Sequence, residues 1–135
     1  MKEQKDSNKI NCSKLILLIM KGEKMIILRG LIPIFISYAI YQRGMNAYGN
    51  EIKSDIEKLL QRPVPRSLIY GTLRRMEKYG IIEKYEDKNS KRIKYKLNEN
   101  GYIFLTKHVE MLKSLSLAIN KVIEDMEKKQ NSNHK

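Results

Sequence analysis

Apolar residues recur along most of this chain at helical spacing, and in one region they alternate as in strands. Helical spacing predicts a first helix from about Leu31 to Gln42, ended by Gly44, with Pro33 in its first turn, where a missing N–H costs little. Its inward face would consist of Ile32, Phe35, Ile36, Ala39 and Ile40. A second helix is predicted from about Tyr48 to Gln61. Its inward residues would be Ile52, Ile56, Leu59 and Leu60.

Pro63 and Pro65 force an extended or turned link before a third helix, which we expect from about Arg66 to Tyr79. Gly80 follows it as a C-cap signal. The buried stripe of this helix would be Ile69, Leu73 and Met76.

Residues 81–86 and 92–97 alternate as strands, and the polar tip 87–91 joins them into a hairpin. Asn98 is predicted as the N-cap of a last helix from about Glu99 to Lys128. The fold class is therefore mostly α with a small β-hairpin (α+β). A helix followed directly by a charged hairpin is the order of a winged helix-turn-helix, in which that helix enters the DNA major groove and the hairpin contacts the backbone.

Charge indicates a polyanionic partner. The 135 residues carry a net charge of +12, which favours DNA, RNA or an anionic membrane surface. Cys12 is the only cysteine, so no intrachain disulfide can form, and no Cys/His group has zinc-ligand spacing. The sequence has no phosphate-binding glycine loop and no nucleophile motif, and His108 is an isolated histidine in a helix. We therefore expect no enzyme, no metal and no cofactor.

The polar side of the third helix holds the first group of candidate DNA-binding residues. Most of them can donate hydrogen bonds, and the one glycine would permit close approach to the groove: Arg66, Ser67, Tyr70, Gly71, Arg74, Arg75 and Lys78. Arg66 is placed to reach bases, whereas the later basic residues would neutralise phosphates. Two other interpretations stay open, a solvated basic helix face and a core position for Tyr70.

The hairpin supplies the second group of candidates. They lie at its tip and on its return strand, where they would bind phosphates rather than bases: Lys88, Lys91, Arg92 and Lys94. Surface loops are often charged for solubility alone. A basic helix followed at once by a basic hairpin tip is less often accidental, which favours DNA binding.

An apolar stripe predicts that the last helix is a dimer interface. Its residues recur at coiled-coil-like spacing, with two further residues widening one side: Leu105, Val109, Leu112, Leu115, Ile119, Val122, Ile123 and Met126. A helix of roughly 30 residues extends about 45 Å, longer than so small a domain needs for its own core. We therefore expect a homodimer. The open alternative is that the stripe folds back on its own subunit, together with residues 15–20.

These patterns divide the chain into four parts. A partly flexible N-terminal extension (1–24) precedes the DNA-binding domain (25–97), the dimerisation helix (98–128) and a flexible tail (129–135). A membrane span needs about 20 mostly apolar residues. The apolar run 15–20 is too short, and charges and a proline interrupt 25–41, so we expect no membrane partner and a cytoplasmic, nucleoid-associated protein.

Several stretches resemble the PadR-type transcriptional regulators. Residues 69–83, IYGTLRRMEKYGIIE, are similar to the third helix of that family, with its Tyr…Leu-x-x-Leu-Glu-x-x-Gly-Leu-Ile pattern. Residues 92–101, RIKYKLNENG, resemble its wing strand and the opening of its last helix. Residues 28–31 and 49–52 are similar to the start of its first helix and to its Gly-Tyr-Glu-Ile motif, although Asn50 replaces the tyrosine and Gly71 replaces a proline that usually follows Tyr70.

The resemblance implies a homodimeric winged-helix transcription factor that acts as a repressor. Some relatives respond to small apolar or phenolic compounds near the dimer interface, so a small-molecule effector is left open here. We therefore expect a sequence-specific regulator of transcription that binds double-stranded DNA. The alternative is a non-specific nucleic-acid-binding protein, architectural or RNA-binding. A third interpretation is a dimeric interaction module whose DNA face has decayed.

Overall fold

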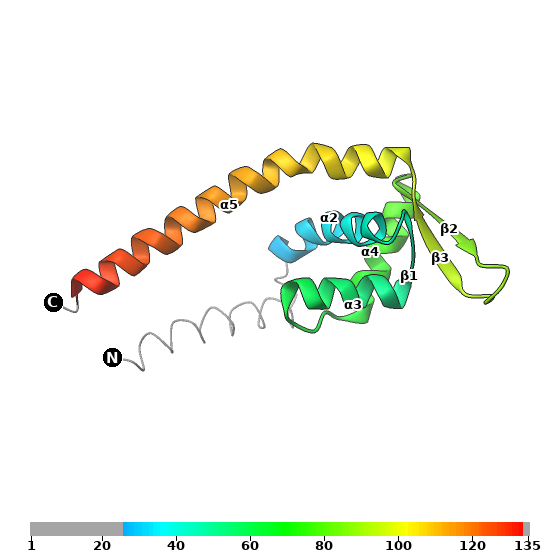
Figure 1. The fold of residues 1–135 in the computed structure, drawn as a ribbon, viewed down its shortest axis with the longest axis horizontal. Coiled ribbons are helices and arrows are strands. Elements are labelled where there is room, and N and C mark those ends of the chain that lie inside the picture. The colour runs from blue at the N-terminus through cyan, green and yellow to red at the C-terminus, as the bar shows by residue number, and fades with distance from the viewer. Residues whose placement is uncertain (1–25, 134–135) are drawn as a thin grey trace.

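Four helices and a three-stranded antiparallel sheet make up the part of the chain that the computed structural model describes, residues 26–133 (Figure 1). In chain order the elements are α2 (Ile26–Gln42), β1 (Asn46–Tyr48), α3 (Gly49–Leu60), α4 (Arg66–Lys78), β2 (Ile82–Glu86), β3 (Ile93–Leu97) and α5 (Glu99–Asn133). The mostly helical fold class with a small β component is confirmed. The predictions on Cys12 and residues 1–24 lie outside the described residues.

The core forms where α2, α3 and α4 pack together beside the sheet. Its fully buried side chains include Ile36 of α2, Ile52 of α3 and Leu73 of α4. Each such apolar side chain contributes about 1.5–3 kcal/mol by leaving water. The predicted inward faces are confirmed except at Phe35 and Leu60, which are half-buried, and at Leu59, which is 50% exposed. Leu59 lies next to the last residue of α3, where it lines a groove beside α2.

The start of α2 corrects the prediction for the first helix. The helix begins at Ile26 rather than near Leu31, so Pro33 lies inside it and not in its first turn. An interior proline lacks the N–H of the helix ladder, and its ring crowds the carbonyl four residues earlier, yet the helix continues on both sides of Pro33. Ser37 Oγ donates a hydrogen bond to the Pro33 carbonyl at 2.9 Å.

A third strand, β1, extends the predicted hairpin into a sheet of order β1-β3-β2. Ala47 of β1 is fully buried and pairs with Tyr95 of β3, while Lys84 of β2 pairs with Tyr95 from the other side. The return strand of the wing is therefore held along both edges. This three-residue strand was not predicted, because its existence depends on pairing with residues far along the chain.

A carboxylate of α3 holds the turn between α3 and α4. Glu57 Oε2 accepts the backbone N–H of Val64 at 2.8 Å and the Lys53 ammonium at 3.1 Å. These two donors, the Val64 amide first, lower the pKa of Glu57. A helix carboxylate thus closes the turn in which Pro63 and Pro65 lie, and the turn leads directly into α4.

The junction between the wing and α5 is tightly packed. Asn98 Oδ1 accepts the Gly101 N–H at 2.9 Å, and Asn98 Nδ2 donates to the Gly80 carbonyl at 2.8 Å. The predicted N-cap is thus confirmed. α5 is longer than predicted and runs to Asn133, and its second half projects past α2 (Figure 1).

Within residues 26–133, no helix is apolar over enough length to cross a membrane.

Candidate nucleic-acid interface

α4 presents a basic side to solvent and an apolar side to the core. Its buried residues are Leu68, Ile69, Thr72, Leu73 and Met76, which include the whole predicted stripe. The exposed residues are Arg66, Ser67, Arg74, Arg75 and Lys78. All five belong to the predicted DNA-binding set, and because they are exposed they are accessible to a ligand.

Tyr70 divides its side chain between the core and the surface. It is half-buried against the core, and a Cβ added to Gly49 would lie 2.5 Å from its hydroxyl oxygen. The Arg66 guanidinium lies 4.6 Å from the centroid of its ring. The open alternative of a core position therefore describes part of this residue, and its outer face supports Arg66 by a cation–π contact.

Farther along α4, Arg75 is held by a hydrogen bond, whereas Gly71 has open space around it. Arg75 Nη2 donates a hydrogen bond to Thr72 Oγ1 at 3.1 Å, and Thr72 Oγ1 in turn donates to the Leu68 carbonyl at 2.7 Å. A Cβ added to Gly71 would meet only the ends of two arginine side chains, each at 3.8 Å. No backbone or core atom crowds Gly71, so this part of α4 is open to the close approach that the prediction assigns to it.

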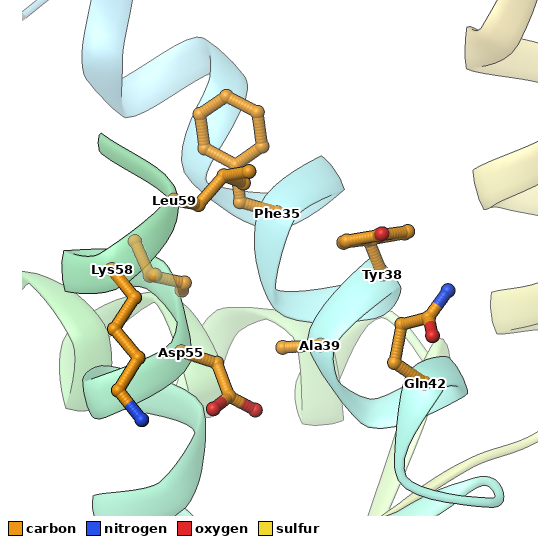
Figure 2. A pocket seen from close by; sticks show the side chains of 8 residues that line it. Phe35, Tyr38, Ala39, Gln42, Asp55, Lys58 and Leu59 are labelled. Carbon is orange, nitrogen blue, oxygen red and sulfur yellow. The ribbon is translucent and has the colours of Figure 1, made fainter. Parts of the chain in front are cut away.

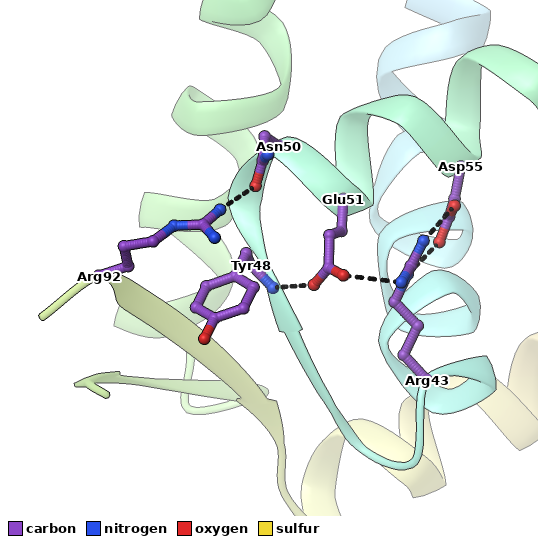
Figure 3. A network of polar contacts seen from close by, with 6 residues as sticks. All are labelled: Arg43, Tyr48, Asn50, Glu51, Asp55 and Arg92. Carbon is purple, nitrogen blue, oxygen red and sulfur yellow. Dashed lines mark hydrogen bonds and ion pairs between the residues drawn. The ribbon is translucent and has the colours of Figure 1, made fainter. Parts of the chain in front are cut away.

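The wing carries cations of two kinds. Lys88 and Lys91 at the tip are exposed, and Lys91 takes a left-handed conformation with φ 57°. Arg92 and Lys94, in contrast, lie against the ring of Tyr48, at 3.9 and 5.1 Å from its centroid. Arg92 Nη2 also donates to Asn50 Oδ1 at 2.8 Å (Figure 3).

Contacts around Tyr48, Gly49 and Asn50 bring the two predicted groups together. Gly49 is the residue against which the Tyr70 hydroxyl of α4 packs, and its neighbour Asn50 holds Arg92 of the wing. The first turn of α3 is therefore the place where the helix face and the wing meet. Neither Tyr48 nor Asn50 was predicted as a site residue, although residues 49–52 resemble a family motif.

A polar network fixes this turn to the rest of the body (Figure 3). Glu51 Oε1 accepts the Tyr48 N–H at 2.9 Å, and Glu51 Oε2 accepts Arg43 Nη1 at 2.8 Å. Arg43 also binds both carboxylate oxygens of Asp55, at 2.7 and 2.9 Å. The network joins the end of α2 to the first two turns of α3.

The predicted dimer stripe on α5 is mostly exposed, with one correction. Leu105 is only 7% exposed and lines the groove between α2 and α5 with Ile34 and Phe35, so it belongs to the contact between these helices of one chain. Leu112 is half-buried. The other stripe residues are 38–62% exposed, namely Val109, Leu115, Ile119, Val122, Ile123 and Met126.

Two apolar grooves flank α2. One of about 440 Å³ lies between α2 and α3, where Phe35, Tyr38 and Leu59 are among the lining residues (Figure 2). The other, of about 390 Å³, lies between α2 and α5 and includes Tyr102 and Val109. Exposed Leu59 lines both grooves, and the second groove also includes Val109 and Leu112 of the α5 stripe.

Comparison with protein families matches residues 39–107, just over half of the chain, to the family described as "Transcriptional regulator PadR-like family". The chain belongs to the PadR-like family. The matched region runs from the end of α2 through α4 and the wing into α5, so it contains every predicted DNA-binding residue. The protein is accordingly a DNA-binding transcription regulator and not an enzyme.

Solved structures agree with this fold. A PadR-like transcriptional regulator from Bacillus cereus has a TM-score of 0.62 at 27% identity, over 71% of this chain and 94% of that one. A transcriptional regulator from Clostridium thermocellum has 0.62 at 23% identity, over 70% and 92%. MepR from S. aureus, solved as a DNA complex, shares the fold with a TM-score of 0.51 at 14% identity, over 94% and 93%. Comparison with curated proteins gave no match.

Proposed function

We propose that this PadR-like regulator binds a specific double-stranded DNA site as a homodimer and represses transcription there. In the proposal, α4 enters the major groove and the wing contacts the neighbouring backbone. The observation that carries it is the meeting of two cationic groups at one turn. Arg66 stacks on Tyr70, which packs on Gly49, and Arg92 is bonded to Asn50 beside it.

The roles we assign follow from position. Arg66, Ser67 and Tyr70 lie at the start of α4, where a recognition helix meets base edges, and arginine can bond guanine through two N–H groups. Gly71 would allow close approach to the groove. The basic residues farther along this helix and on the wing would bind phosphates, namely Arg74, Arg75, Lys78, Lys88, Lys91, Arg92 and Lys94.

We propose that the dimer forms through α5. The stripe residues on its outer half remain 38–62% exposed in the described part of the chain, and exposed contiguous apolar surface of this kind usually marks an interface. A two-fold dimer would place two copies of α4 about one DNA turn apart, near 34 Å. The groove between α2 and α5 includes Leu105, Val109 and Leu112 of the same stripe, and it is where we would look for a small apolar effector.

A non-specific nucleic-acid-binding protein is the alternative that the net charge of +12 alone would favour. The fixed placement of Arg66 on Tyr70 favours the specific function, because non-specific phosphate binding needs charge but no defined side-chain orientation. Repression is the direction that the family resemblance implies. With a reporter gene placed downstream of the selected site, repression would give lower expression when the protein is present.

Selection of bound duplexes from a random DNA pool tests the proposal. We expect a palindromic consensus with two half-sites about one helical turn apart. Enrichment of no sequence over the starting pool would contradict sequence-specific binding and favour the non-specific alternative.

A further inference from the structure

We propose that Tyr48 is a positioning residue that locks the wing tip in place before DNA arrives. The lock itself is a property of the free protein, whereas its effect on DNA rests on the proposed function. Tyr48 is the last residue of β1 and pairs with Lys94 of β3. Its side chain therefore starts from the body of the protein and reaches the return strand of the wing.

The hydroxyl of Tyr48 holds the tip through Asp87. It donates a hydrogen bond to Asp87 Oδ2 at 2.5 Å, and Ser90 Oγ donates to the same oxygen at 3.0 Å. Asp87 Oδ1 accepts the backbone N–H of Asn89 at 3.2 Å. These donors, with Tyr48 as the largest cause, lower the pKa of Asp87, so the carboxylate stays ionised and accepts strong hydrogen bonds. Asp87 thus joins the tip loop to β1.

A carboxylate at this position otherwise opposes the proposed function. Asp87 precedes Lys88 on a hairpin tip that we propose to face phosphates, and its negative charge repels them. An ionised acceptor forms stronger hydrogen bonds than a neutral one, and three donors converge on this side chain. Fixing the loop is a role that accounts for an acidic residue among the wing cations.

The ring of Tyr48 acts on a second part of the wing. The Arg92 guanidinium lies 3.9 Å from the ring centroid, and its Nη2 donates to Asn50 Oδ1 at 2.8 Å (Figure 3). Stacking and hydrogen bonding together restrict the arginine rotamers in the free protein. Less side-chain entropy is then lost when Arg92 meets a phosphate, which favours binding.

Tyr48 is itself anchored to the helix-turn-helix. Its N–H donates to Glu51 Oε1 at 2.9 Å, and Glu51 is paired with Arg43 at the end of α2. A wing tip tied to Tyr48 is therefore tied to α3, against whose first residue the Tyr70 side chain of α4 packs. The lock fixes the wing relative to the helix that we propose reads the bases.

The test is Tyr48→Phe, which removes the hydroxyl and keeps the ring under Arg92. The matched control is Tyr79→Phe, because Tyr79 is 77% exposed at the end of α4. The N–H of Asn89 donates to Asp87 Oδ1, and the N–H of Lys91 donates to the Asp87 carbonyl at 2.7 Å. We therefore expect amide exchange at both residues to accelerate about fivefold in Tyr48→Phe, the effect of losing one hydrogen bond of ordinary strength. The midpoint of thermal unfolding, measured alongside, should stay near the wild-type value.

For DNA, we expect Tyr48→Phe to weaken affinity for the selected site about two- to tenfold. The slope of log K against log salt should stay unchanged, because every phosphate-binding cation is still present. Asp87→Ala should accelerate exchange at Lys91 in the same way, and the Tyr79→Phe control should alter neither exchange nor affinity.

Four results would decide against parts of this proposal. Unchanged exchange at Asn89 and Lys91 in Tyr48→Phe overturns the lock, whether or not DNA is bound. Faster exchange with unchanged affinity overturns its role in DNA binding. A shallower salt slope shows that a wing cation no longer neutralises its phosphate in the variant, which overturns the claim that Tyr48 acts by ordering the tip alone. A wild type that binds no duplex overturns the proposed function, while the exchange rates still decide the lock.

Discussion

At the scale of single residues, two glycines make room for the contacts that shape the interface. Gly49 leaves space for the Tyr70 hydroxyl, and Gly101 lies so close to Leu97 and the Ile81 carbonyl that an added Cβ would collide with both. Both positions fall in stretches that resemble family motifs. Their physical reason, close approach by residues distant along the chain, is visible only in three dimensions.

Gly101→Ala should therefore destabilise the fold. One collision partner is a backbone carbonyl, which cannot move away cheaply, so we expect a loss of about 1–3 kcal/mol in the free energy of unfolding. The matched control is Gly71→Ala, where the nearest atoms lie at 3.8 Å and alanine favours the helix, by up to about 1 kcal/mol. Denaturant unfolding measures both. A Gly101→Ala protein as stable as the wild type would contradict the close packing at the start of α5.

Arg66→Ala and Arg74→Ala test the base-reading role of α4. Each should weaken binding to the selected site, and removal of an arginine that binds a base should cost about 1–3 kcal/mol and relax specificity at one position. Arg66 is the better candidate for binding a base, because Tyr70 holds its guanidinium in place. Titration of selected and singly altered duplexes provides the measurement. Unchanged affinity and consensus in the double variant would exclude α4 from recognition.

At the scale of the elements, local patterns predicted what depends on local sequence. The stripe Ile69, Leu73 and Met76 is buried as its spacing indicated, and Asn98 caps α5 through its own side chain. α4 occupies Arg66–Lys78, close to the predicted bounds. These features follow from helical periodicity and capping chemistry, which involve residues no more than a few positions apart.

The features that escaped prediction depend on pairing across the chain. β1 has three residues and exists because Ala47 pairs with Tyr95, nearly fifty positions later. The same pairing brings Tyr48 beside the wing, where its ring packs against Arg92. The sequence showed Arg92 only as one of several neighbouring basic residues, so its contacts with Tyr48 and Asn50 could not be predicted. Leu105 fits the α5 stripe by spacing. It is nevertheless buried, because the first part of α5 lies beside α2.

The two exposed lysines at the wing tip test the phosphate role of the wing without disturbing the anchored Arg92. Lys88→Ala/Lys91→Ala should lower affinity for every duplex nearly alike, because phosphate binding carries no sequence information. The slope of log K against log salt should become shallower by about 0.9 for each phosphate that the variant no longer neutralises. Lys84→Ala, on the exposed β2 strand away from the tip, serves as the charge control. An effect confined to one sequence would instead show that the wing reads bases or groove shape.

At the scale of the whole molecule, α5 carries an apolar surface that residues 26–133 of the same chain leave exposed. The helix continues for 35 residues, and most of its apolar stripe beyond Leu112 is exposed. The sequence pattern alone indicated this surface, because a period near 3.5 is visible without any partner. A second copy of the chain is the occupant that we propose.

The prediction for this surface is a homodimer that Leu112→Glu/Ile119→Glu dissociates, because burying two carboxylates in an apolar seam is costly. The matched control is Ser114→Glu/Leu117→Glu, which adds the same charge on the side of α5 away from the stripe; Leu117 is 71% exposed. Sedimentation at micromolar concentration separates the states. A monomeric wild type, or a stripe variant that stays fully dimeric, would place the interface elsewhere or remove it.

The most direct test of the central claim is the ratio of two affinities of the wild-type protein at one salt concentration. One duplex carries the site selected from the random pool, and the other carries the same bases in scrambled order. Sequence-specific regulators typically favour their site by about 10³-fold or more, and we expect a ratio in that range, reduced by Arg66→Ala. A ratio near one, with tight binding to both duplexes, would contradict specific recognition by α4 and identify a non-specific nucleic-acid-binding protein.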